Sequence, residues 1–109
     1  MWKKVELAGL TPVASLEGAA LDWAVAKAIG EYKPVAVPPY STDWAQGGPI
    51  IEREVICIGS GMDAPTWYAN KGLGKYHQFG TTPLIAAMRC YVASKLGDEV
   101  EVPDELGEK

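Results

Sequence analysis

The sequence predicts an α+β fold in which helices pack on a short antiparallel sheet. Three observations lead to this class. A helix-like segment lies near each end of the chain, at residues 16–29 and 82–96, and each is followed by a glycine. Three short runs of strand-forming residues lie between these segments. A chain of 109 residues is long enough for one modest core, so we expect a single globular domain.

The first helix is predicted over residues 16–29, within SLEGAALDWAVAKAIG. Ser15 is a suitable N-cap, and Gly30 stands where a left-handed residue commonly ends a helix. Apolar residues recur at helical spacing on one narrow face, made of Leu21, Ala24, Val25 and Ala28. The small alanines of this face predict close packing against another element.

The segment PPYSTDWAQGGP, residues 38–49, is the most unusual in the chain. Its two opening prolines favour an extended approach, because each pushes the preceding residue out of the helical region. One of the three polar residues at 41–43 then caps a helix that continues into PIIERE. We expect the glycine pair at 47–48 to loosen or break the first turn, and Pro49 to restart the helix.

Three strands are predicted in EVICIG, TWYAN and KYHQFG, between residues 54 and 80. Apolar, β-branched and aromatic residues in runs of this length are typical of strands. KGLG, residues 71–74, supplies glycines for the positive φ angles of a hairpin, and GSGMDAP, residues 59–65, supplies a longer connection. Consecutive short strands joined by turns predict an antiparallel meander covered by the helices.

The clearest element is the helix predicted over residues 82–96, in TTPLIAAMRCYVASKLG. Thr82 is a good N-cap, Pro83 suits the first helical position, and Gly97 ends the helix. The expected buried face consists of Leu84, Ile85, Met88, Val92 and Leu96. We divide the chain into a globular domain, residues 1–97, and an acidic C-terminal tail, residues 98–109, which we expect to lie loosely on the surface and to be dispensable for folding.

The net charge of −4 is unevenly distributed. The tail holds six acids and one base, so the other 97 residues, with nine bases and eight acids, are close to neutral. A neutral body lacks the basic face that duplex DNA requires, so we expect no duplex nucleic acid partner. No apolar run is long enough to span a membrane, and the N-terminal segment lacks the apolar run of a secretory signal. We therefore expect Cys57 and Cys90 to be buried, unpaired thiols.

Catalytic and metal-binding patterns are weak. His77 is the single histidine, and no spacing places it beside a cysteine as a nucleophilic dyad. One histidine and two scattered cysteines do not make a closed zinc site. GSG at residues 59–61 lacks the third glycine and the following helix of a dinucleotide fingerprint, and a hairpin turn explains it better. We expect neither an enzyme nor a cofactor.

Aromatic residues are the strongest functional signal. The chain has four tryptophans and five tyrosines but one phenylalanine. Trp and Tyr combine a large apolar face with a polar tip, which suits recognition surfaces, although they would also enlarge a core poor in leucine and isoleucine. Trp44 is either a core residue under the turn or, with Tyr40, the wall of a pocket whose floor is a helix N-terminus.

The pocket hypothesis assigns roles to several residues. The helix starts at Thr42-Asp43 and Thr81-Thr82 would receive phosphate groups, and Trp44 or Trp67 would stack on a base. Arg89 or Lys71 would supply positive charge. A carboxylate at residue 43 repels phosphate unless it caps the helix or accepts from a ribose hydroxyl. The predicted ligand-binding residues are Tyr40, Ser41, Thr42, Asp43, Trp44, Trp67, Thr81, Thr82 and Arg89.

Three blocks of the sequence carry a resemblance to a known family. ALDWAVAKAIG, YSTDWAQGGPIIERE and TPLIAAMRCYVASKLGDEVEVPDEL resemble the NinX-like proteins of tailed phages, and the PPYSTD and TPxxA signatures are similar to those of a broader phage α/β/α-sandwich group. The blocks cover about two-thirds of the chain in the family's order. The resemblance implies a small α/β/α sandwich fold and a phage accessory protein that acts in the bacterial host cytoplasm, and it implies no catalytic residue.

Two functions from different classes follow. In the first, the protein binds and sequesters a small polar, nucleotide-type host molecule as a counter-defence, without altering it. In the second, it is a non-enzymatic interaction module that inhibits a host protein through its aromatic patch and acidic tail. A short exposed sheet and surplus tryptophans also predict a homodimer.

Overall fold

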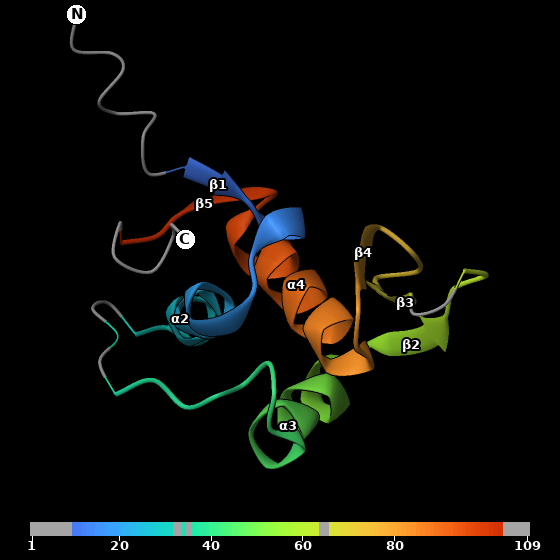
Figure 1. The fold of residues 1–109 in the computed structure, drawn as a ribbon, viewed down its shortest axis with the longest axis horizontal. Helices are drawn as coiled ribbons and strands as arrows, with labels where there is room; N and C mark the ends of the chain where they lie inside the picture. The colour runs from blue at the N-terminus through green and yellow to red at the C-terminus, as the bar shows by residue number, and fades with distance from the viewer. Residues whose placement is uncertain (1–9, 32–33, 35, 64–65, 104–109) are drawn as a thin grey trace, which may run out of the picture.

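Figure 1 shows the fold, a computed structural model that describes residues 10–31, 34, 36–63 and 66–103. The structure of Trp2 and of residues 104–109 lies outside this range. The elements follow one another as β1 (Leu10–Pro12), the 3-10 helix η1 (Val13–Ser15), α2 (Gly18–Ile29), α3 (Trp44–Glu54), β2 (Cys57–Ser60), β3 (Trp67–Lys71), β4 (Tyr76–Gly80), α4 (Pro83–Leu96) and β5 (Glu99–Glu101).

Helix α4 forms the middle layer of the fold (Figure 1). The strands β2, β3 and β4 pack on one side of it, and α2 and α3 pack on its remaining surface. The α+β class and a sheet covered by a helix are therefore confirmed. The expectation that the first helix packs on the sheet is wrong, because α2 packs mainly on α4.

The central position of α4 explains why its burial extends beyond the predicted face. Leu84, Met88 and Val92 are buried as expected, whereas Ile85 is half-buried and Leu96 is 37% exposed. A helix with neighbours on several sides is apolar nearly all round. Its other buried residues are Ala86, Ala87, Cys90, Tyr91 and Ala93.

The ends of α4 follow the sequence signals. Thr82 is the N-cap, and its Oγ1 accepts a hydrogen bond from the backbone N–H of Ile85 at 3.1 Å. Pro83 is the first helical residue, and Gly97 is the C-cap with a φ of 96°. A glycine takes this positive φ without the steric cost that a Cβ brings. The predicted start and end of this helix are confirmed.

The start of α2 differs from the prediction. The helix begins at Gly18, after the extended residue Glu17, and not after Ser15. Ser15 lies in η1, where its hydroxyl donates to the carbonyl oxygen of Pro12 at 3.0 Å. A serine used in this local turn is not available to cap the helix three residues later. Gly30 ends α2 as expected, with a φ of 129°.

Helix α3 runs without a break through the glycine pair, so the expected interruption at residues 47–48 is wrong. Gly47 is buried, and a Cβ there would collide with the carbonyl oxygen of Tyr40 and lie 2.7 Å from Cδ1 of Leu84. Gly47 therefore allows α3 to pack closely against Tyr40 and against Leu84 of α4, and it does not bend the helix. Pro49 lies inside the helix, where it removes one backbone donor.

The strands β2, β3 and β4 form the predicted antiparallel meander, in that order. In the register, Cys57 pairs with Asn70, and Trp67 pairs with Gly80. The β3–β4 hairpin turns at residues 72–75, where three successive residues have positive φ, two of them glycines. This local chemistry confirms the hairpin predicted from KGLG.

The start of the acidic segment belongs to the folded body. β5 pairs antiparallel with β1, and Thr11 lies opposite Val100. Val100 and Val102 are buried in the core, at 6% and 5% exposure. The expectation that the chain lies loosely on the surface from residue 98 is therefore wrong as far as Val102. Alternation along β5 buries Val100 between the exposed Glu99 and Glu101, and Val102 follows the strand.

Candidate functional site

The first predicted phosphate site, at the start of α3, has its backbone donors engaged. The N–H groups of Thr42 and Asp43 both donate to the carbonyl oxygen of Pro39, at 3.2 and 3.0 Å. The Asp43 carboxylate caps the helix by accepting from the N–H of Ala45 at 3.0 Å. Trp44 begins the helix and is 53% exposed, so it is not a core residue under the turn. A capped helix start with its own carboxylate is a poor phosphate site.

The second predicted phosphate site, at the start of α4, is also capped from within. Thr82 accepts from the helix, as described above, and its carbonyl oxygen accepts from the N–H of Ala86. Both Thr81 and Thr82 are exposed. The contact between Gly47 and Leu84 brings the first turns of α3 and α4 together.

Tyr40 and Ser41 lie inward rather than on an open pocket wall. Ser41 is 1% exposed, and its N–H donates to Oδ1 of Asp22 on α2 at 2.7 Å. Its hydroxyl is buried without a hydrogen-bond partner among the described residues. Burial raises the pKa of the half-buried Tyr40, and the charges of Glu31, Tyr91 and Asp22 add to the effect. This pair joins the 38–43 segment to α2.

Arg89 and Trp67 hold the fold together. The Arg89 guanidinium donates from Nε to the carbonyl oxygen of Leu16 at 2.8 Å and from Nη1 to that of Phe79 at 2.7 Å. Burial lowers its pKa, and the charge of Glu17 opposes this shift. Trp67 is half-buried against the core on the sheet face that α4 covers. These contacts give both residues a structural role.

The sheet presents its second face outward. Ala69 is fully buried and Gly80 approaches α4 closely, since a Cβ there would lie 2.6 Å from the backbone nitrogen of Ala86. Because side chains alternate along each strand, the opposite residues point away from α4. This outer sheet face consists of Cys57, Gly59, Tyr68, Asn70, His77 and Phe79.

The aromatic rings of the outer sheet face are assembled in a continuous group. Tyr68 and His77 stack with centroids 5.5 Å apart and an interplanar angle of 13°. Phe79 meets His77 edge to face at 4.9 Å and is 55% exposed. The Tyr68 ring extends over Gly59, where a Cβ would lie 2.7 Å from Cε2 of the ring. The absence of a side chain at Gly59 thus leaves room for the Tyr68 ring.

Sequence reasoning missed this face because it depends on register. It selected Trp67, which points to α4, and not its neighbour Tyr68, which points outward. The alternation of His77 and Phe79 in KYHQFG was a signal, but a one-residue shift would have reversed the faces. Cys57 was expected to be buried, and it is exposed on this face. Cys90 is buried as expected, and burial raises its pKa to about 11.

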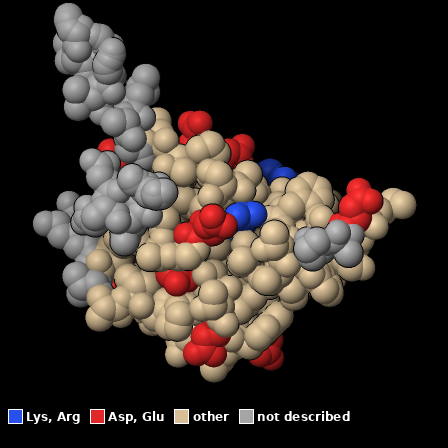
Figure 2. Space-filling model, in the orientation of Figure 1, with Lys and Arg blue, Asp and Glu red and all other residues tan. Residues whose placement is uncertain are grey.

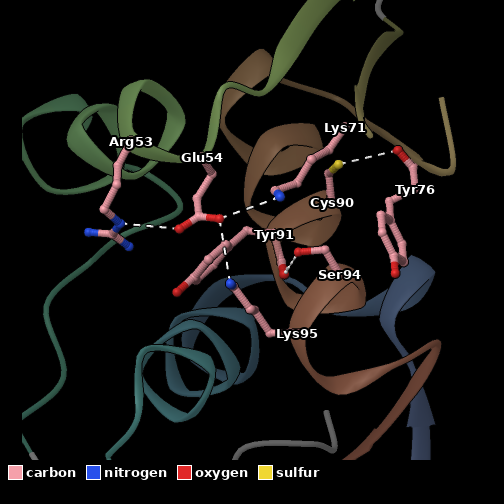
Figure 3. Close-up of polar contacts among 8 residues, drawn as sticks. All are labelled: Arg53, Glu54, Lys71, Tyr76, Cys90, Tyr91, Ser94 and Lys95. Carbon is pink, nitrogen blue, oxygen red and sulfur yellow. Dashed lines mark hydrogen bonds and ion pairs between the residues drawn. The ribbon is translucent and has the colours of Figure 1, made fainter. Parts of the chain in front are cut away.

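Figure 3 shows a second concentration of polar groups, the Glu54 cluster, which consists of Glu54 with Arg53, Lys71 and Lys95. Glu54 Oε2 accepts from Arg53 Nε at 3.2 Å. Glu54 Oε1 lies 3.5 Å from Lys71 Nζ and 3.6 Å from Lys95 Nζ. One carboxylate therefore links the end of α3, the end of β3 and the last turns of α4.

The electrostatics of the Glu54 cluster favour the ionised carboxylate. Burial by itself would raise the pKa of Glu54, whose side chain is 13% exposed. The hydrogen bond from Arg53 and the charges of Lys95 and Lys71 outweigh burial, so the pKa lies below its ordinary value. The ring of Tyr91 also contacts this group, with Lys95 Nζ 6.0 Å from its centroid.

Comparison with known protein families identifies the family of this chain. The model of the family described as Bacteriophage P22, NinX matches residues 29–95, which is more than half of the sequence. The chain belongs to the NinX family. The resemblance of the three sequence blocks to NinX-like phage proteins is thereby confirmed. No curated protein matches the chain.

The NinX match covers the parts of the structure that carry both surface features. It spans α3, the whole meander and all but the last residue of α4. It therefore includes the outer sheet face and every member of the Glu54 cluster, whereas β1 and β5 lie outside it. None of the helices in the described part of this NinX-family chain is long and apolar enough to cross a membrane.

Proposed function

We propose that this phage accessory protein acts by binding a host protein through its outer sheet face. The observation that carries the proposal is the exposed group of stacked rings on a sheet face that is turned away from α4. Membership of a phage family supports the accessory role. Binding without catalysis agrees with the weak catalytic patterns of the sequence.

The composition of the outer sheet face suits a protein partner. Its six strand residues are uncharged, and three of them are aromatic. The cores of protein interfaces are depleted in charge and enriched in aromatic residues. A rigid ring such as Phe79, already ordered by contact with His77, loses little conformational freedom on binding.

Other ligands fit this face less well. A nucleic acid requires a basic surface, and the outer sheet face has no Lys or Arg among its six strand residues. The side of the molecule displayed in Figure 2 also has few Lys and Arg among scattered carboxylates. Small polar molecules favour concave sites that bury most of the ligand, whereas Phe79, at the end of this ring group, is 55% exposed. The helix starts expected to hold a nucleotide's phosphates have most of their donors engaged within the chain.

The test combines contact mapping with an affinity measurement. A photo-reactive amino acid placed at residue 79 should crosslink to one discrete protein in a bacterial host lysate. The same group at residue 62, where Met62 is 99% exposed outside the sheet, is the matched control. After purification of that protein, Phe79→Ser should weaken binding at least about tenfold, the loss typical of an aromatic hot spot.

Several outcomes would overturn the proposal. Equal crosslinking from residues 62 and 79, or unchanged affinity of Phe79→Ser, would exclude the outer sheet face. Crosslinks only between copies of the chain would support the predicted homodimer instead. Saturable quenching of tryptophan fluorescence by a nucleotide, with the nucleotide recovered intact, would support the sequestration hypothesis.

A further inference from the structure

The Glu54 cluster contains more positive charge than its carboxylate neutralises. Three cations surround a single anion, which leaves two excess positive charges in a chain whose net charge is −4. Lys71 and Lys95 contact the same oxygen of Glu54, so the sum of the two distances limits the separation of their ammonium groups to 7.1 Å. A tetrahedral oxyanion would be able to contact both.

The cations also keep unused donors on the solvent side. Each ammonium group has three N–H donors, and the contact with Glu54 uses one. The side chains of Arg53, Lys95 and Lys71 are 55%, 42% and 24% exposed, whereas that of Glu54 is 13% exposed. The carboxylate therefore lies beneath the cations, and a second anion would approach them from solvent without displacing it.

The cluster is held by the framework of the fold. Its cations come from the last turn of α3, the end of β3 and the last turns of α4, and the shared carboxylate fixes them relative to one another. The Tyr91 ring, 2% exposed, lies within cation–π distance of Lys95. Such preorganisation lowers the cost of binding.

We propose that Arg53, Lys71 and Lys95 form a binding site for a phosphate-type oxyanion, with Glu54 as the internal counter-ion. Glu54 positions the cations and also competes with the ligand for their charge. The phosphate group belongs either to a small molecule or to a phosphorylated protein. This site is separate from the outer sheet face and stands independently of the host-protein proposal.

The test uses the full chain and inorganic phosphate as the probe, at low ionic strength because salt screens exposed charges. Two-dimensional NMR should show saturable shifts centred on the Glu54 cluster. Lys71→Gln and Lys95→Gln should each weaken phosphate binding by about tenfold, since each removes a charged donor. Lys75→Gln is the matched control, because Lys75 lies exposed in the β3–β4 hairpin outside the cluster, and its affinity should equal that of wild type.

Glu54→Gln provides a readout that a purely structural ion-pair cluster would not give. It keeps the shape of the side chain but removes the competing charge, so phosphate should bind more tightly. Weaker binding in the folded variant, or equal loss in the Lys75→Gln control, would overturn the proposal, as would shifts without saturation. If Glu54→Gln does not fold, the lysine variants decide the question. Adenosine monophosphate and a phosphoserine peptide, titrated in parallel, identify which source binds more tightly than free phosphate.

Discussion

Replacing Gly47 by alanine tests how closely α3 packs on its neighbours. A Cβ at residue 47 would collide with the carbonyl oxygen of Tyr40 and lie 2.7 Å from Cδ1 and 3.4 Å from Cγ of Leu84. The Leu84 side chain can rotate away, but the Tyr40 oxygen belongs to the backbone and moves only with the 38–43 segment. Gly48 is a matched control, because the nearest atom to its Cβ would be Cε3 of Trp44 at 3.9 Å, an ordinary contact.

Two opposing effects decide whether each substitution stabilises or destabilises the protein. Alanine stabilises a helix interior relative to glycine by about 0.8–1.0 kcal/mol. Gly48→Ala keeps this gain, so we expect it to stabilise the protein by about 1 kcal/mol. Overpacking costs about 1–3 kcal/mol, and the backbone contact at Gly47 places its cost in the upper part of that range. We expect Gly47→Ala to destabilise by about 1–2 kcal/mol, a separation of roughly 2–3 kcal/mol between neighbouring glycines.

Urea unfolding followed by circular dichroism measures both changes. The midpoints should move in opposite directions at unchanged m-values, because neither variant alters the surface exposed on unfolding. A thermal scan should show the same order, at about 4–8 °C per kcal/mol for a domain of this size. If Gly47→Ala were as stable as Gly48→Ala, the space between α3, Tyr40 and Leu84 would be wider than the structure shows, and the reasoning would be wrong.

Three further predictions concern other parts of the fold. Because the pKa of Glu54 is lowered, its stabilisation is complete above the unfolded value near 4.5 and is lost as pH falls through the folded value. Glu54→Gln should cost up to about 1 kcal/mol at pH 7, because the partly exposed cations are screened by solvent. Urea unfolding at lower pH should show the difference between the two proteins closing. A thiol reagent should modify Cys57 in the folded protein but Cys90 only after denaturation, so a second rapid equivalent would contradict the burial of Cys90. Truncation after Gly97 removes Val100 and Val102, two buried valines worth about 1.5–3 kcal/mol each, and should lower thermal stability. Truncation after Pro103 keeps both valines and is the control. Equal thermal stability of the two truncated proteins would refute the role of β5.

Local chemistry made several features predictable. The start and end of α4 follow from a threonine side chain that reaches the N–H three residues on and from a glycine that takes a positive φ. The β3–β4 hairpin follows from the glycines of its turn, and the meander follows from three short strands in succession. Each of these features depends on residues a few positions apart, so a single sequence contains the information.

The features that the sequence did not predict depend on contacts between distant parts of the chain. Arg89 was predicted to serve a ligand, but its donors reach the carbonyl of Leu16, 73 positions away, and that of Phe79. Nothing near Val100 in the sequence indicates that β1 lies beside it. The composition of the outer sheet face depends on which strand residues face α4. The Glu54 cluster forms only where α3, β3 and α4 meet. Such contacts depend on register and packing, where a one-residue shift exchanges a buried side chain for an exposed one.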